Sequence, residues 1–213
     1  MMNSCEELRA AMAALPLVAI LRGVRPAEVQ PIGDALVGNG WRLLEVPLNS
    51  PDPFASIATL AKAFPQALVG AGTVLSAAQV QQVHAAGGRL IVAPNFNADV
   101  VREAVRLRMA CLPGVFTATE AFAALEAGAA AIKLFPAEMI PPAGVKALRA
   151  VLPPDTLVLP VGGIAIGNMA DYRAAGADGF GIGSALYKPG VSAGDVEQRA
   201  LDFRAAWAST IRA

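Results

Sequence analysis

Short runs of apolar residues alternate along the chain with longer segments whose apolar positions recur at helical spacing. The apolar runs predict eight β-strands, at residues 17–23, 43–48, 68–74, 89–94, 110–115, 131–136, 157–163 and 179–184. They recur roughly every 21 to 26 residues, the length of one compact strand–helix unit. Runs without polar alternation are typical of parallel strands that are buried on both faces.

Eight such units without a hairpin signal predict an α/β protein with a single-domain (β/α)₈ TIM barrel, and an open doubly wound sheet is the alternative. One domain is expected to span residues 1–213, with no linker or break in composition. Residues 1–16 are predicted to form a helix that covers the bottom of the barrel, and residues 192–213 a closing helix. Ser76 and Asn97 are predicted helix N-caps.

Composition excludes several classes of function. The 17 basic and 17 acidic residues balance, so nothing indicates binding to nucleic acid or to an anionic membrane. No apolar run reaches the roughly 18 residues of a membrane-spanning helix, and the start shows no export signal, which predicts a cytoplasmic protein. A single histidine and two cysteines without metal-ligand spacing argue against histidine triads and metal sites. No cofactor is expected.

Active sites of such barrels lie at the carboxyl ends of the strands. The polar groups and glycines predicted there come from distant parts of the chain, and they are Arg22, Glu45, Thr73, Asn95, Lys133, Gly162, Gly163 and Ser184. The fold would bring them together at one end of the barrel.

Lys133 and Glu45 each lie alone among apolar residues in a predicted strand. Burial lowers the pKa of a lysine, and a neutral amine is a nucleophile that forms a Schiff base with a ketone. Burial raises the pKa of a carboxyl group, which suits it to proton transfer near neutral pH. A buried structural ion pair between the two residues is the alternative interpretation.

Two glycine-containing segments, 162–163 and 181–184, end the seventh and eighth predicted strands. Backbone N–H groups of Gly162, Gly163 and Gly183, together with the Ser184 hydroxyl, are suited to hold a phosphate. The planar guanidinium of Arg22 matches the two oxygens of a carboxylate, and a surface salt bridge is the alternative role for this arginine.

The motifs that carry these residues resemble those of the class I aldolases that act on 2-keto-3-deoxy-6-phosphosugar acids. They are residues 19–23 (AILRG), 44–51 (LEVPLNSP), 70–75 (GAGTVL), 113–114 (PG), 132–136 (IKLFP), 161–164 (VGGI) and 181–184 (GIGS). The similarity covers nearly the whole chain. It implies a metal-independent, cytoplasmic homotrimer that cleaves its substrate to pyruvate and glyceraldehyde 3-phosphate.

The resemblance also implies roles for individual residues. Lys133 would form the Schiff base and Glu45 would move protons, while Arg22 and Thr73 would hold the pyruvoyl carboxylate. The remaining substrate-binding residues would be Asn95, Phe135, Val161, Gly162, Gly163, Gly183 and Ser184. Phe135 is equally well explained as a core residue.

Residues 47–50 and Val161 are similar to the branch of the family that acts on the 6-phosphogalactonate-derived substrate. A threonine before the glycine pair is typical of the gluconate branch, and Val161 removes that hydrogen-bonding hydroxyl. The galactonate-derived substrate is therefore expected, and the same reaction on its C4 epimer is the alternative. A phosphosugar isomerase or epimerase and a non-catalytic phosphosugar-binding barrel are the further alternatives.

Overall fold

The computed structural model describes residues 4–210, so residues 1–3 and 211–213 of the two predicted terminal helices lie outside the described chain. Each predicted apolar run contains a strand, and the fifth contains two short ones. The strands are β1 (Leu17–Ile20), β2 (Leu43–Pro47), β3 (Leu68–Gly72), β4 (Leu90–Val92), β5 (Ala110–Leu112), β6 (Gly114–Val115), β7 (Ile132–Leu134), β8 (Val158–Pro160) and β9 (Phe180–Ile182).

Most strands end before the predicted positions, because their last residues leave the extended conformation. Gly23, Gly162 and Gly163 have positive φ angles of 83°, 103° and 63°, which lie outside the β region. These residues therefore form loops beyond the strand ends rather than the strand ends that the apolar pattern predicts.

Helices follow the strands in alternation. They are α1 (Ser4–Ala14), α2 (Pro26–Gly38), α3 (Pro53–Ala63), α4 (Ala77–Ala85), α5 (Ala98–Arg106), α6 (Ala118–Glu126), α7 (Pro142–Arg149), α8 (Met169–Ala174) and α9 (Ala193–Ser209), with 3₁₀ turns η1 (Ala137–Met139) and η2 (Ile166–Asn168). The Ser76 and Asn97 side chains accept hydrogen bonds from the backbone at the starts of α4 and α5, which confirms both predicted caps. Within residues 4–210, no helix is long and apolar enough to cross a membrane.

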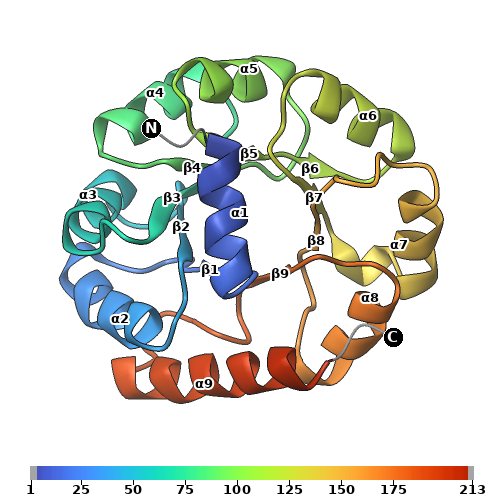
Figure 1. The fold of residues 1–213 in the computed structure, drawn as a ribbon. Helices are drawn as coiled ribbons and strands as arrows, with labels where there is room; N and C mark the ends of the chain where they lie inside the picture. Colours follow the sequence, from blue (N-terminus) through green and yellow to red (C-terminus); the bar gives the residue numbers. More distant parts are fainter. Residues whose placement is uncertain (1–3, 211–213) are drawn as a thin grey trace.

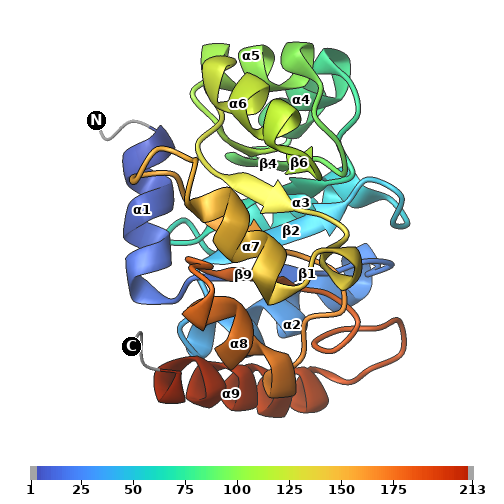
Figure 2. The same cartoon turned by 90° about the vertical axis from the view of Figure 1, so that its right-hand side faces the viewer.

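The strands form a curled parallel sheet with helices outside it (Figures 1 and 2). Six strands pair in the order β5-β4-β3-β2-β1-β9, and three in the order β6-β7-β8. β5 and β6 are successive parts of one segment that is interrupted at Pro113. A parallel bridge between Val161 and Gly181 connects the segment after β8 to β9. The α/β class and the parallel sheet agree with the sequence prediction.

Two apolar clusters hold this arrangement together. The larger one packs the strands against the surrounding helices, and it includes the fully buried Trp41. The smaller one lies inside the curled sheet, where Val18, Leu43 and Leu159 meet Leu8 and Met12 of α1. Helix α1 lies across this end of the sheet (Figure 1). Burying a side chain such as Leu8 contributes about 2 kcal/mol, so α1 covers the amino-terminal ends of the strands stably.

Candidate active site

A cavity of about 190 Å³ opens at the carboxyl ends of the strands. Its lining consists of Ile20, Arg22, Glu45, Thr73, Lys133, Phe135, Glu138, Val161, Gly162, Gly163, Ile164, Gly181, Gly183 and Ser184. Every predicted site residue except Asn95 is in this set. Asn95 is exposed and its amide donates to the Phe96 carbonyl over 3.3 Å. The fold therefore brings together predicted site residues that lie up to 162 positions apart in the sequence, from Arg22 to Ser184.

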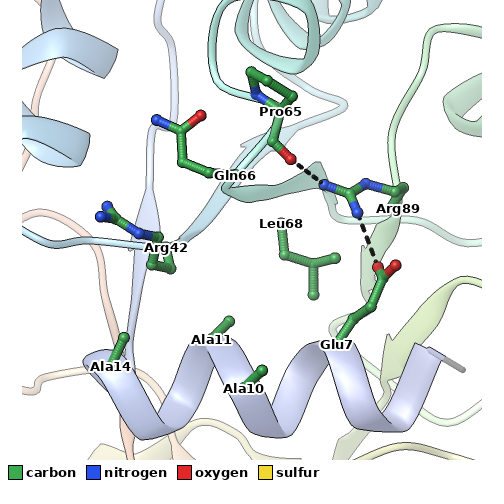
Figure 3. A pocket seen from close by; sticks show the side chains of 9 residues that line it. All are labelled: Glu7, Ala10, Ala11, Ala14, Arg42, Pro65, Gln66, Leu68 and Arg89. Atoms are coloured by element: carbon green, nitrogen blue, oxygen red, sulfur yellow. Dashed lines mark hydrogen bonds and ion pairs between the residues drawn. The ribbon is translucent and has the colours of Figure 1, made fainter. Parts of the chain in front are cut away.

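A larger cavity of about 310 Å³ lies at the opposite end, between α1 and the starts of the strands (Figure 3). Its charged groups already have partners. Arg89 pairs with Glu7 over 2.9 Å and also donates to the Pro65 carbonyl, and Arg42 donates to the carbonyls of Val37 and Trp41. The described lining contains no candidate nucleophile, so the chemistry belongs to the smaller cavity.

Lys133 and Glu45 face the smaller cavity from β7 and β2. Both are buried, with 6% and 2% of their surfaces exposed. The Lys133 ammonium lies 4.4 Å from the centre of the Phe135 ring. The two residues form no direct ion pair within the described chain, and Oε2 of Glu45 has no hydrogen-bond partner there. Oε2 of Glu45 and the Lys133 ammonium are therefore not joined to each other and can interact with a bound substrate.

The pKa values of both groups move toward neutrality. Burial raises the pKa of Glu45 to about 7, against the opposing charges of Lys133 and Arg22. Burial also lowers the pKa of Lys133; the charge of Glu45 opposes this change and that of Arg22 adds to it. A carboxyl group whose pKa is about 7 can both take up and release a proton near neutral pH, and a lowered lysine pKa increases the share of the neutral amine.

Gly72 makes room for the Glu45 carboxylate. β2 and β3 pair in parallel, and a methyl group at Gly72 would lie 1.7 Å from Oε2 of Glu45. Any larger residue at position 72 would displace the carboxylate. The sequence pattern indicated only that a glycine lies near the end of a strand, because this contact between strands is not local.

Arg22 lies beyond the end of β1 and is held by the loop that follows β2. Its Nη1 donates to Oδ1 of Asn49 over 2.6 Å, and the N–H of Gly23 donates to Oγ of Ser50 over 2.9 Å. Asn49 and Ser50 thus connect the loop after β2 to the loop after β1, and they hold the Arg22 guanidinium at the rim of the cavity. The structure has no acidic partner for Arg22 among its described ion pairs.

Thr73 lies directly after β3 with a φ of 57°, in the left-handed region that non-glycine residues rarely adopt. Such strained residues cluster at functional sites, where the surrounding structure holds them in place. The strain is therefore consistent with a residue whose side chain has to point into the cavity.

Gly162, Gly163 and Ser184 lie at the wall of the cavity formed by the loops after β8 and β9. Apart from the parallel bridge of Val161 with Gly181, no backbone hydrogen bond involves their N–H groups among residues 4–210. Unpaired backbone N–H groups in a loop with positive φ angles form a concavity that binds anions. The arrangement is suited to a phosphate.

Glu138 also lines the cavity, and sequence reasoning missed it. It belongs to η1, which follows β7 after Pro136, where no strand or helix pattern marks a site. Its carboxylate lies against Gly162 and Gly163. The signal that would have pointed to it is a charged residue just beyond the strand that carries Lys133.

Comparison with known families agrees with this geometry. The model of the family described as KDPG and KHG aldolase matches residues 8–200. The chain belongs to this family. It is therefore an aldolase, a carbon–carbon lyase, and its cavity is the place where that chemistry is expected.

Individual relatives have a more specific name than the family. The chain is 52% identical to a probable 2-dehydro-3-deoxy-6-phosphogalactonate aldolase of Rhizobium meliloti (strain 1021), over 90% of this chain and 91% of the relative. It is 45% identical to the 2-dehydro-3-deoxy-6-phosphogalactonate aldolase of Escherichia coli (strain K12), over 93% and 97%. A solved structure described as native KDPGal has a TM-score of 0.91 at 45% identity, and covers 92% of this chain and 96% of its own.

Proposed function

We propose that this aldolase cleaves 2-dehydro-3-deoxy-6-phospho-D-galactonate to pyruvate and D-glyceraldehyde 3-phosphate through a Schiff base on Lys133. The observation that carries the proposal is a buried lysine of lowered pKa, without a direct ion pair, beside a carboxyl group whose pKa is about 7. The names of the relatives at 52% and 45% identity support the choice of substrate.

The reaction begins at the ketone. The neutral amine of Lys133 attacks C2, and uptake of one proton with loss of water gives a protonated imine. Glu45 takes the proton of the C4 hydroxyl, the bond between C3 and C4 breaks, and its electrons move into the imine to form an enamine. The aldehyde leaves, Glu45 returns a proton to C3, and water releases pyruvate, the free amine and the proton taken up when the imine formed. The imine is the electron acceptor, so the reaction requires neither a metal nor an organic cofactor.

Other residues of the cavity would hold the substrate. Arg22 and Thr73 are proposed to bind the carboxylate beside C2, because the guanidinium is free of acidic partners at the rim. The free N–H groups of Gly162, Gly163 and Ser184 are proposed to bind the phosphate at C6, with Gly183 beside them. Phe135 would pack against the imine. A substrate-binding role is least supported for Asn95, because its side chain is exposed and does not line the cavity.

Val161 is proposed to set the preference at C4. It directly follows β8, pairs with Gly181 of β9 and lines the cavity. A valine cannot hydrogen-bond a substrate hydroxyl, whereas a threonine of similar shape could. One such contact is worth about 1 kcal/mol.

The sheet also has an arrangement that would allow it to close, and the protein surface carries apolar side chains. We propose that the curled sheet closes as a (β/α)₈ barrel through the segment containing β5 and β6 and through the bridge at Val161, and that residues 1–213 form one domain. We further propose a cytoplasmic homotrimer. Large apolar side chains are exposed at Leu75, Val105, Phe116 and Phe122, and contact with another copy would remove such side chains from water.

The test is cleavage of the two purified C4 epimers, measured as kcat/KM in the wild type and in Val161→Thr. A higher kcat/KM for the galactonate-derived epimer is expected, and the variant should move the ratio toward the gluconate-derived epimer. A wild type that prefers the gluconate-derived epimer overturns the assigned substrate. An isomerase, an epimerase or a binding protein would release no pyruvate from either.

A further inference from the structure

We infer that Glu138 tunes the affinity of the cavity for phosphate: its carboxylate lies against the glycines proposed to bind the phosphate and weakens that binding. The inference rests on the proposed function, because that function locates the phosphate at Gly162 and Gly163. It concerns a side chain to which neither the sequence motifs nor the proposed mechanism assigns a role.

The position of Glu138 follows from the space around the two glycines. A methyl group at Gly162 would lie 2.3 Å from Oε2 of Glu138, and one at Gly163 would lie 2.5 Å from its Cγ. The side chain therefore lies directly over the glycine pair and occupies the space that any other residue there would need. Glycine is required at both positions for this reason as well as for their positive φ angles.

The charge of Glu138 is not neutralised by a neighbour. Among the described ion pairs none involves this residue, and the positive groups that line the cavity, Arg22 and Lys133, interact instead with Asn49 and with the Phe135 ring. An ionised carboxylate only accepts hydrogen bonds, so it offers no donor to a phosphate oxygen. A phosphate bound at Gly162 and Gly163 meets an unpaired negative charge at the same wall.

The size of the effect follows from Coulomb repulsion. One carboxylate charge about 6 Å from a phosphate dianion, in the high dielectric of an exposed wall, weakens binding by about tenfold, or ~1.4 kcal/mol. The repulsion acts equally on the phosphorylated substrate and on the phosphorylated product. It therefore raises KM without changing the chemical step, and it speeds release of glyceraldehyde 3-phosphate.

The experiment compares Glu138→Gln, which removes the charge and keeps the shape, with the wild type. Glu126→Gln is the matched control, because Glu126 is an exposed glutamate at the end of α6, away from the cavity. We expect Glu138→Gln to lower KM for the phosphorylated substrate about tenfold, to change kcat less than twofold, and to lower the inhibition constant of inorganic phosphate to a similar extent. Glu126→Gln should change none of these values.

An unchanged or higher KM in Glu138→Gln, together with unchanged inhibition by phosphate, overturns the inference. Calorimetric titration of inorganic phosphate into the same proteins, and into Glu138→Ala if the glutamine variant does not fold, gives an answer that requires no turnover. A wild type that binds phosphate but cleaves neither epimer refutes the proposed function alone. A wild type that cleaves its substrate while the Glu138 variants bind phosphate no more tightly refutes the role of Glu138 alone.

Discussion

Glu45→Gln is expected to make the protein more stable and much less active. The substitution removes a buried ionisable group and keeps its shape. Because burial raises the pKa of Glu45 from 4.5 to about 7, the folded state binds its proton more tightly than the unfolded state. The stability that this tighter proton binding contributes is fully present below pH 4.5 and is lost as the pH rises to about 7. A shift of this size corresponds to about 3 kcal/mol.

The free energy of unfolding of the two proteins should therefore be similar at pH 4.5 and should diverge up to pH 7. Above pH 7 the variant is expected to be more stable by about 3 kcal/mol, in urea titrations at one protein concentration. Its kcat should fall about 10²-fold or more, the scale expected for a positioned acid–base group. The wild-type kcat should itself decline below pH 7 as Glu45 takes up a proton. Equal unfolding free energies of the wild type and Glu45→Gln at pH 8 would show that burial of the Glu45 carboxylate does not destabilise the folded protein.

Three further outcomes follow from the same geometry. Lys133→Ala is expected to abolish cleavage and to leave the fold intact, as measured by pyruvate release and circular dichroism; substantial remaining cleavage would refute the Schiff base. Gly72→Ala should lower kcat at least tenfold because its methyl group meets the Glu45 carboxylate, whereas Gly38→Ala, which meets no atom within 4 Å, is the control with wild-type kcat. Light scattering at micromolar concentration should give the mass of a trimer, and a monomer would contradict the assembly proposed from the exposed apolar side chains.

The sequence singled out the proposed catalytic pair because each charged residue stands alone in an apolar run. Such a pattern is rare, since an unpaired charge in a buried strand is costly unless it has a function. The parallel strand order then brings Glu45 of β2 and Lys133 of β7 to one cavity, although 88 positions separate them. Local patterning was therefore sufficient to predict that these two residues lie in one cavity.

The same reasoning was insufficient where the exact end of a strand decides the outcome. β4 ends at Val92, so the chain has turned away before Asn95, whose side chain is exposed. Arg22 also lies beyond its strand, yet the contact with Asn49 keeps it at the rim. Whether a residue beyond a strand faces the cavity depends on contacts between loops, and apolar periodicity carries no information about them.

Glu138 and Gly72 illustrate a second limit. Each acts through a contact with a different strand or loop: Glu138 with the glycine pair after β8, and Gly72 with a carboxylate of β2. Neither contact has a signature in the residues around it. Both contacts join residues that are distant in the sequence and adjacent only in the folded protein.

The most direct test of the account is to trap the Schiff base. The protein is incubated with pyruvate and sodium borohydride, digested and mapped by mass spectrometry, with Lys133→Ala as the matched control. We expect a reduced pyruvate adduct on Lys133 and none on the other lysines, Lys62, Lys146 and Lys188. An unmodified Lys133, or an equal adduct in the variant, would contradict the assignment of this residue as the nucleophile.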